Sequence, residues 1–457
     1  MRQTATLTEG TIGKVLFRFS MPFLLANLLQ ALYGAVDLMI VAKYCDPDSI
    51  AAVSTGTQIT QIITSVIAGL TMAGTILVAK YVGKGQMDKV QKTIQTTLLS
   101  FAVFSVLLMV VVMASASFLL HILQIPESAF TEAREYILLC CTGIFFICEY
   151  NALSAVLRGY GDSLRPLYFV AIACVCNIIG DIYTVGYLHM GASGTALATV
   201  VSQCVSMVVA LFYINRNKGL FPFSLKKLHI DRTILKELIT VGIPVSFQET
   251  MVRCSFLYLT AITNSFGIYA ASAVGIAGKY DVFAMLPATS IANALTALTA
   301  QNIAYGKAKR AREFLRYGTI TALLCSTVFF LWAQLSPQSM IRMFSIDAQV
   351  IQEGIPFLRA CSFDYLAVSI LFCMNGYLNG KERTIFTMLN CCSGALLIRV
   401  PLLYVLSSYG FVSMYIYGLV SPISSLFMLG VLWFYSRQLH PIRTLLALFP
   451  LQRFHRF

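Results

Sequence analysis

The chain has 457 residues, of which 58% are hydrophobic and only 12% are charged, and its mean hydropathy is +0.75. About 25% of the residues of a soluble globular domain are charged, so this composition excludes that class and indicates a protein embedded in a lipid bilayer. The formal net charge of +13 is spread through short segments between apolar runs, so it requires neither nucleic acid nor another acidic partner.

Twelve apolar runs follow one another along the chain. A bilayer-spanning helix needs about 20 mainly apolar residues, whereas a spanning β-barrel would show segments of about ten residues with alternating hydropathy. These runs are long and continuous, which predicts an all-α polytopic membrane protein with twelve transmembrane helices. In chain order they lie at residues 12–41, 49–79, 93–119, 135–157, 166–187, 192–214, 236–263, 269–303, 317–338, 351–378, 384–406 and 409–436.

The distribution of basic residues predicts the orientation of these helices. Of the 33 Lys and Arg residues, 26 lie on the same side as the N-terminus, in the segments between the runs or at the ends of runs; three lie in the opposite loops and four lie deeper inside the runs. Cytoplasmic loops of membrane proteins are enriched in Lys and Arg, so we expect both termini in the cytoplasm.

The two halves of the sequence are similar to one another. The segment "SMPFLLANLL" (20–29) aligns with "GIPVSFQETM" (242–251), and further matches follow at nearly the same offset. Three pairs of positions support the alignment: Pro22 with Pro244, Gly85 with Gly306, and Gly159 with Gly380. Each half contains six runs, and an even number gives both halves the same orientation. We therefore predict two parallel six-helix repeats around a central cavity, an arrangement that transporters use to open alternately to each side.

The repeat divides the chain into four expected regions. They are an N-lobe at 1–214, a basic cytoplasmic linker at 215–235, a C-lobe at 236–436 and a basic cytoplasmic tail at 437–457. The composition of the tail suits either a helix that lies on the inner leaflet or an irregular chain.

Six segments occur in a characteristic order. They are "MPFLLANLLQALYGAVDLMIVAKY" in the first run, "GLTMAGTILVAKYVGKG" at the end of the second, "LRGYGDSLRPL" between the fourth and fifth, "NIIGDIY" in the fifth, "GASGTALATVVSQ" in the sixth and "LIRVPLLYVL" in the eleventh. In this order and spacing they resemble the bacterial branch of the multidrug and toxic compound extrusion (MATE) family, over nearly the whole chain. The resemblance implies secondary active efflux of organic, mostly cationic drugs by antiport with H⁺ or Na⁺, and hence antibiotic resistance.

Two carboxylates at membrane depth are the candidate centre of this activity. Asp37 lies in the first run and Asp181 in the fifth, with Asn177 four residues before Asp181 on the same helical face, and Thr199 lies in the sixth run. A charged side chain inside a membrane is costly and usually faces a bundle interior or a watery cavity. Their oxygen atoms suit a small cation such as Na⁺, and two neighbouring carboxylates could instead share a proton.

The resemblance implies the same use of these four residues. In bacterial members of the family, an equivalent Asp in the first helix, an Asn/Asp pair in the fifth and a Thr in the sixth form the coupling-ion site. The alternative is a structural role, in which Asp37, Asn177, Asp181 and Thr199 are satisfied by neighbouring donors and bind no ion.

Three further residues are candidates for the substrate cavity. Tyr33 lies one turn before Asp37, and an aromatic face can bind an organic cation. The C-lobe acids Glu249 and Asp364 are the other two. Because other members of the family use C-lobe carboxylates for coupling at positions that do not match Glu249, no coupling role is assigned to them.

The charges of the C-lobe can also be interpreted as structural ion pairs. Glu249 could neutralise Arg253, which lies four residues later on the same helix. Asp364 could pair with either Arg359 or Arg399. The sequence leaves these alternatives open.

Three other charged residues lie within apolar runs. Lys279 and Asp281 face different sides of one helix, so each is expected to pair with another part of the chain. Glu149 lies near the inner half of the fourth run, where a structural role is the simpler interpretation.

No pattern for catalysis or nucleotide binding is present in the sequence. The five histidines lie in loops or in the tail, and the glycine-rich "YVGKGQMDK" lacks the GxxxxGK[ST] spacing of a phosphate-binding loop. We therefore expect a monomeric transporter rather than an enzyme, with no cofactor other than its coupling ion. The expected partners are small organic cations and the bilayer, not nucleic acid. The alternative function is a flippase for lipids or lipid-linked oligosaccharides, whose cavity would need Arg and Lys to hold a pyrophosphate.

Overall fold

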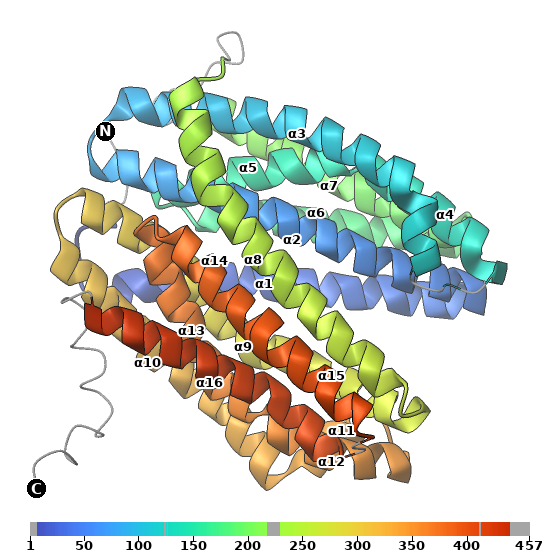
Figure 1. Cartoon of the computed structure of the whole chain (residues 1–457). Coiled ribbons are helices and arrows are strands. Elements are labelled where there is room, and N and C mark those ends of the chain that lie inside the picture. The colour runs from blue at the N-terminus through green and yellow to red at the C-terminus, as the bar shows by residue number, and fades with distance from the viewer. Residues whose placement is uncertain (1–6, 123–124, 126, 217–228, 411–412, 439–457) are drawn as a thin grey trace, which may run out of the picture. The chain divides into compact units, whose positions relative to one another are not determined.

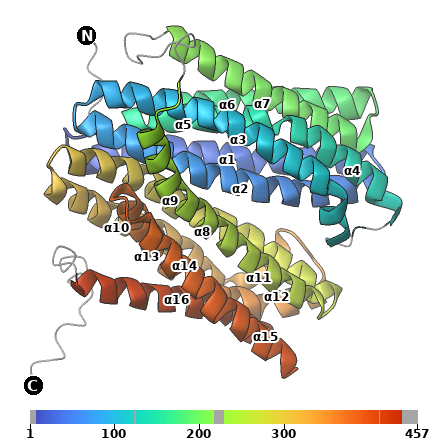
Figure 2. The ribbon, with the colours of Figure 1, turned by 45° about the horizontal axis from the view of Figure 1, so that its top comes forward.

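The computed structural model describes residues 7–122, 125, 127–216, 229–410 and 413–438, and all regular structure in them is helical. The first half contains α1 (Ile12–Tyr44), α2 (Pro47–Gly83), α3 (Met87–Ile122), α4 (Glu127–Thr142), α5 (Ile144–Tyr160), α6 (Leu164–Asp181), η1 (Ile182–Tyr187) and α7 (Gly191–Arg216). The second half contains α8 (Arg232–Asn264), α9 (Ile268–Ala304), α10 (Ala308–Leu335), α11 (Pro337–Arg342), α12 (Ala348–Cys361), α13 (Phe363–Gly380), α14 (Thr384–Ser393), η3 (Gly394–Arg399), α15 (Val400–Ser408) and α16 (Met414–Gln438). Figure 1 and Figure 2 show these helices from two directions. The middle of the predicted linker and nearly all of the predicted tail lie outside the described residues.

Each predicted run coincides with a long helix or a broken helix in the described part of the chain. Ten of these are long and apolar enough to cross a bilayer, and α4 with α5 forms an eleventh that bends by 42° at its break. The remaining run is the 33-residue helix α8, in which five charged residues lower the mean hydropathy. The prediction of an all-α polytopic membrane fold is confirmed.

The chain divides into two compact units, which are described separately. The first unit contains residues 1–250, 296–311 and 380–384, and the second contains residues 251–295, 312–379 and 385–457. The first unit thus includes all of the predicted N-lobe together with short pieces of the predicted C-lobe. These pieces are the start of α8, the end of α9, the start of α10 and the connection between α13 and α14.

Two close helix contacts show the internal repeat in the structure. At Gly159, a Cβ atom on α5 would lie only 2.9 Å from the carbonyl oxygen of Thr75 on α2. At Gly380, a Cβ atom on α13 would lie 2.5 Å from the carbonyl oxygen of Thr296 on α9. Only glycine permits so close an approach of another backbone. Both members of the second contact lie 221 residues after those of the first, so the sequence repeat is also a structural repeat.

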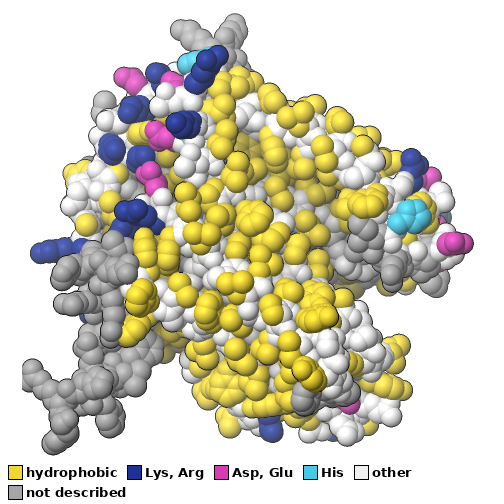
Figure 3. All heavy atoms as spheres, in the orientation of Figure 1, with side chains coloured by type: hydrophobic (Ala, Val, Ile, Leu, Met, Phe, Trp, Pro, Cys, Tyr) yellow, Lys and Arg dark blue, Asp and Glu magenta, His cyan; other side chains and the backbone are white. Residues whose placement is uncertain are grey.

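The outer face of α3 shows how the first unit meets the lipid. Leu107, Val110, Val111 and Phe118 on this helix are 56–66% exposed. In Figure 3, apolar side chains cover the middle of the first-unit helices, and Lys and Arg gather near their ends. So large an apolar surface suits contact with acyl chains rather than with water.

A network of charged groups joins three segments at the end of α2. The ammonium group of Lys80 lies 3.3 Å from a carboxylate oxygen of Glu237 on α8 and 2.9 Å from one of Glu382, which follows α13. The hydroxyl of Tyr81 donates to Glu237 at 2.7 Å. We call Lys80, Tyr81, Glu237 and Glu382 the α2-end network.

The residues before α1 bind the end of α9. The amide of Leu7 donates to the side-chain oxygen of Gln301 at 3.0 Å, and the side-chain amide of Asn302 donates to the carbonyl oxygen of Leu7 at 3.1 Å. The ammonium group of Lys307 donates to the carbonyl oxygen of Thr8 at 3.1 Å. Because Leu7, Gln301 and Asn302 are all buried, this segment is an integral part of the first unit.

Replacing Lys80 by methionine is expected to destabilise the first unit. It removes both ion pairs of the α2-end network, each of which contributes up to about 1 kcal/mol when partly exposed. We therefore expect the free energy of unfolding to fall by about 1–2 kcal/mol. High salt screens exposed charges, so it should reduce the difference in stability between the variant and the wild type. Thermal unfolding of the purified protein measures both effects. Lys84→Met is the matched control because Lys84 is exposed. Equal stability of the two variants would contradict the prediction.

Candidate functional site

Three packed helices bring the predicted coupling-ion residues together. α1 packs along α6, and α6 packs along α7. Asp37 lies on α1, Asn177 and Asp181 on α6, and Thr199 on α7. The carboxyl groups of Asp37 and Asp181 interact directly, and the side-chain amide of Asn177 donates to the hydroxyl of Thr199 at 3.5 Å. We call these residues the four-residue cluster.

The sequence of α6 explains why its two polar residues point inward. The buried positions recur every three or four residues and include Val170, Ala173, Cys174, Asn177 and Asp181. This spacing is that of one face of an α-helix. Directly after Asp181 the chain continues as the π-helix η1, and such π segments are frequent at functional sites. Apolar and polar residues thus share one buried face, and the regular helix ends at a carboxylate.

The cluster is buried and short of hydrogen-bond donors. Asp37 is 9% exposed, Asn177 is 1% and Asp181 is 0%. Within the described residues, one oxygen of Asp37, both carboxylate oxygens of Asp181 and the amide oxygen of Asn177 have no donor. The ion pairs found in the described part of the chain include neither carboxylate.

These four oxygen atoms need a partner that the protein does not supply. Two ionised carboxylates only accept hydrogen bonds, so a bond between Asp37 and Asp181 requires a proton on one of them. An isolated buried charge is far too costly to remain uncompensated. The arrangement is therefore suited either to hold one or more protons or to bind a small cation that prefers oxygen ligands.

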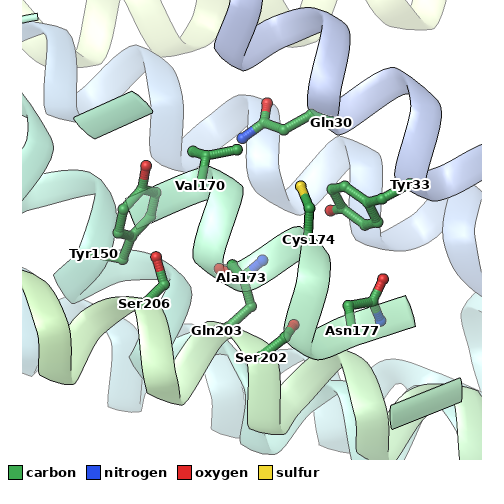
Figure 4. A pocket seen from close by; sticks show the side chains of 10 residues that line it. All are labelled: Gln30, Tyr33, Tyr150, Val170, Ala173, Cys174, Asn177, Ser202, Gln203 and Ser206. Carbon is green, nitrogen blue, oxygen red and sulfur yellow. The ribbon is translucent and has the colours of Figure 1, made fainter. Parts of the chain in front are cut away.

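A cavity lies beside the cluster and shares Asn177 with it. The volume that the centre of a water-sized sphere can reach in it is about 20 Å³. The lining comes from four helices of the first unit: Gln30 and Tyr33 from α1, Tyr150 from α5, Val170, Ala173, Cys174 and Asn177 from α6, and Ser202, Gln203 and Ser206 from α7 (Figure 4). A space of this size admits about one water molecule, so a drug-sized ligand would need the cavity to widen.

The three predicted cavity residues have different surroundings within their units. Tyr33 lines the cavity of the first unit. Glu249 is exposed on α8 and also belongs to the first unit. Asp364 is buried in the second unit. Tyr33 therefore lies next to the four-residue cluster, within the first unit.

Three charged residues in spans of the second unit, Lys279, Asp281 and Asp364, have partners within that unit. Asp281 accepts a hydrogen bond from the hydroxyl of Tyr365 at 2.8 Å, and the ammonium group of Lys279 lies 5.0 Å from the centre of the Phe344 ring. Of the two arginines considered for Asp364, Arg399 interacts with it electrostatically. These contacts favour structural roles for the three charges in this unit.

Several cavity residues were not predicted from the sequence. Gln30, Tyr150 and Gln203 are examples, and single residues of these types occur equally often in ordinary helix packing. A signal was available on α7, where Thr195, Thr199, Ser202 and Ser206 follow one another at helical spacing. This polar stripe in an apolar helix indicates the face that α7 turns toward the cavity.

Comparison with known sequences finds a family profile and individual relatives that match this chain. The profile of the MatE family matches residues 22–183 and, a second time, residues 244–405. The chain is 27% identical over 372 residues to the "Probable multidrug resistance protein YpnP" of Bacillus subtilis, with 81% of this chain and 82% of the relative covered. It is 20% identical to the "Multidrug export protein MepA" of Staphylococcus haemolyticus, with 92% and 90% covered.

Solved structures share the fold. An outward-facing multidrug resistance transporter of the MATE family superimposes with a TM-score of 0.87 at 19% identity, covering 96% of this chain and 98% of the other. A transporter of the MOP superfamily from Pyrococcus furiosus, described as having a binding pocket of reverse polarity, gives the same TM-score and coverage at 20% identity. Both similarities extend over nearly the whole chain, which agrees with the all-helical fold described above.

Proposed function

The chain belongs to the MatE family, and from this premise we propose that it is a multidrug efflux antiporter of a bacterial inner membrane, which exports organic cations in exchange for H⁺ or Na⁺. The family match covers both halves, and curated relatives carry names that refer to multidrug resistance or export. We further propose that the N- and C-lobes are the two moving parts and that both termini lie in the cytoplasm, because 26 of the 33 basic residues lie on that side.

One observation carries the proposal more than any other. Buried oxygen atoms of Asp37, Asn177 and Asp181 have no donor within the described residues, although they lie at membrane depth. A purely structural polar cluster would satisfy its own groups. An ion site must instead leave them free for an ion that enters and leaves during transport.

Competition for negative charge is the proposed basis of coupling. When the cluster opens to the outside, an inward-moving H⁺ or Na⁺ neutralises the single negative charge that Asp37 and Asp181 carry when they share one proton. The neutral cluster no longer attracts an organic cation, so the drug leaves. When the cluster opens to the cytoplasm, the ion leaves and the carboxylates attract the next drug. Two ligands that bind the same charge lower one another's affinity, and this reciprocity couples their movements.

The cavity lining favours cations with aromatic or aliphatic parts. Tyr33 and Tyr150 present aromatic rings to the cavity, and each such ring can contribute about 0.5–2 kcal/mol to the binding of a cation. The hydroxyl and amide groups of Ser202, Gln203 and Ser206 provide adaptable hydrogen bonds. A mixed surface of this kind accepts many related molecules rather than one.

Replacing Thr199 by valine is expected to weaken ion binding without loss of folding. The change keeps the shape of the side chain but removes the hydroxyl that accepts from Asn177. One such group contributes about 0.5–1.5 kcal/mol, so the ion concentration for half-maximal efflux should rise about two- to twelvefold. Thr199→Ser keeps the hydroxyl and should behave like the wild type. If the valine variant keeps the wild-type ion dependence, Thr199 does not contribute to the site.

Transport by purified protein in lipid vesicles tests the proposed function. Vesicles are prepared with either a pH gradient or a Na⁺ gradient, and movement of the fluorescent cation ethidium is followed. We expect one of the two gradients to drive ethidium against its own concentration gradient, and collapse of that gradient by an ionophore to stop it. Failure of both gradients with folded protein would overturn the proposal.

A further inference from the structure

The turn between α2 and α3 binds the beginning of the second half of the chain. At the end of α2, Lys80 and Tyr81 bind Glu237 in α8, as described above. In α3, the ammonium group of Lys92 lies 3.2 Å from a carboxylate oxygen of Asp231, the residue directly before α8. The amide of Asp231 donates to the hydroxyl of a threonine in α3 at 3.0 Å. The residues of these contacts, which we call the first clasp, are Lys80, Tyr81, Lys92, Thr96, Asp231 and Glu237.

The turn between α9 and α10, the equivalent helices of the second half, binds the beginning of the first half. At the end of α9, Gln301 and Asn302 bind Leu7, as described above. At the start of α10, the guanidinium group of Arg310 donates to the carbonyl oxygen of Glu9 at 2.8 Å. The residues of these contacts, which we call the second clasp, are Leu7, Thr8, Glu9, Gln301, Asn302, Lys307 and Arg310.

The internal repeat relates the two clasps to one another. Gln301 lies 221 residues after Lys80, which is the offset of the two repeat glycines described above. The helix ends that carry these residues also meet. A Cβ atom at Gly83 would lie 2.9 Å from the Cβ atom of Ala304, its own counterpart at the same offset. Two equivalent positions can touch only near the axis that relates their segments, so the clasps are equivalent contacts on either side of this axis.

Both clasps join the N-lobe, or the segment before it, to the beginning of the C-lobe or to its helices, and all their residues belong to the first unit. The pieces of the C-lobe in this unit are the segments that the clasps bind, together with residues 380–384, which contain Glu382. The clasps lie at the end of the helices that carries the basic segments, which is the cytoplasmic end in the proposed orientation. A transporter with two moving lobes must separate them at this end before it opens to the cytoplasm.

We propose that the two clasps form the cytoplasmic gate of this transporter and that they open together. In the conformation seen, the clasps close the cytoplasmic end, and a drug enters from the cytoplasm only after both have separated. The proposal rests on the proposed function, because it takes the N- and C-lobes as the moving parts. It specifies that function further, because it identifies the contacts that determine how often the cytoplasmic end opens.

The two clasps differ in chemistry. Of the four ion pairs in the described part of the chain, three join α2 or α3 to residues 231–237 or to Glu382. The second clasp instead binds backbone groups of residues 7–9, and Leu7, Gln301 and Asn302 are buried. Salt screens partly exposed ion pairs much more than it weakens buried hydrogen bonds. We therefore expect salt to weaken the gate through the first clasp.

Weakening the first clasp should open the second. The amide of Leu7 donates to Gln301, so its hydrogen–deuterium exchange reports the opening of the second clasp in the whole purified protein. Lys80→Met removes two partly exposed ion pairs of the other clasp and of Glu382. We expect Leu7 to exchange about 5–30-fold faster in this variant. Lys80→Arg keeps the charge and should exchange like the wild type.

Two control variants separate gate opening from other effects. Lys84→Met removes an exposed lysine four residues after Lys80 and should leave the exchange of Leu7 unchanged. Gly159→Ala disturbs the contact between α5 and α2 but changes no clasp residue, so it should also leave this rate unchanged. A wild-type rate in Lys80→Met would show that the clasps open independently, and the inference would be wrong. Equal acceleration in Gly159→Ala would reduce the effect to general destabilisation and would overturn the inference as well.

The wild-type protein provides a second test that requires no variant. Raising KCl from about 0.1 M to about 1 M shortens the screening length from about 10 Å to about 3 Å. The exchange rate of Leu7 in the wild type should then approach that of Lys80→Met, whereas the rate in the variant should change little. A wild-type rate that does not depend on salt would contradict the proposed gate.

Transport provides an independent measurement of the same opening. For ethidium supplied on the cytoplasmic side, the half-saturating concentration should fall in Lys80→Met by the same factor, because more molecules are open on that side. An unchanged half-saturating concentration, together with faster exchange, would show that the clasps do not control drug entry. The exchange of Leu7 requires neither a drug nor an ion gradient. A failure of the proposed function, seen as absent transport by the wild type, is therefore distinguished from a failure of the gate.

Discussion

Replacing Asp181 by asparagine is expected to abolish gradient-driven efflux while the protein remains folded in the membrane. The substitution preserves the shape of the side chain and removes the charge that the coupling ion must neutralise. Because a buried charge contributes about 3–5 kcal/mol to its partner, ion affinity should fall by more than about 100-fold. Asp37→Asn should have the same effect, because the two carboxyl groups interact directly. Drug efflux from cells and from vesicles measures the loss.

Glu149→Gln is the matched control for these two variants. Glu149 on α5 is also a buried carboxylate of the first unit, but it does not belong to the four-residue cluster. We expect this variant to retain efflux, because glutamine preserves its packing. Retained coupling in either aspartate variant would remove that residue from the ion site. Loss of efflux in Glu149→Gln would show that the effect is not specific to the cluster.

Replacing Gly380 by alanine is expected to destabilise the folded protein. The new Cβ would lie 2.5 Å from the carbonyl oxygen of Thr296, a backbone atom that cannot move alone. Overpacking of this kind costs about 1–3 kcal/mol, a large fraction of the stability of a typical protein. The amount of folded protein in the membrane and its thermal midpoint should both decrease. Gly159→Ala should behave alike, because it disturbs the equivalent contact.

Gly430→Ala on α16 provides the control for these glycines. A Cβ at this position would meet no atom within 4 Å. Alanine is favoured over glycine inside a helix by about 1 kcal/mol, so this variant should be as stable as the wild type or slightly more stable. If Gly380→Ala were as stable as Gly430→Ala, the close approach of α13 and α9 would not depend on glycine.

The long helices and their repetition could be predicted from the sequence because both depend on patterns within the chain. Apolar runs of the length of a bilayer locate the spans, and Gly159 and Gly380 mark equivalent packing contacts. The break between α4 and α5 and the π-helices η1 and η3 were not predicted. These features depend on the packing between neighbouring helices, which cannot be predicted from the local amino-acid composition.

The candidate site was predictable to a similar extent. Asp37 and Asp181 could be predicted because carboxylates are rare at membrane depth. The resemblance to a known family indicated Asn177 and Thr199. The sequence could not show that Arg399 rather than Arg359 interacts electrostatically with Asp364, because this depends on how the helices of the second unit pack. Tyr150 was missed because an aromatic residue in a membrane helix is too common to be a signal.

The attachment of Leu7 to Gln301 and Asn302 bears on how the protein is made. The start of the chain leaves the ribosome first, yet its binding partners are synthesised nearly 300 residues later. At about 5–20 residues per second, this delay lasts roughly 15–60 s. During that time Leu7 has no partner to bind, and the insertion machinery must handle the chain in this state. Assembly of the first unit therefore ends only after most of the protein has entered the membrane.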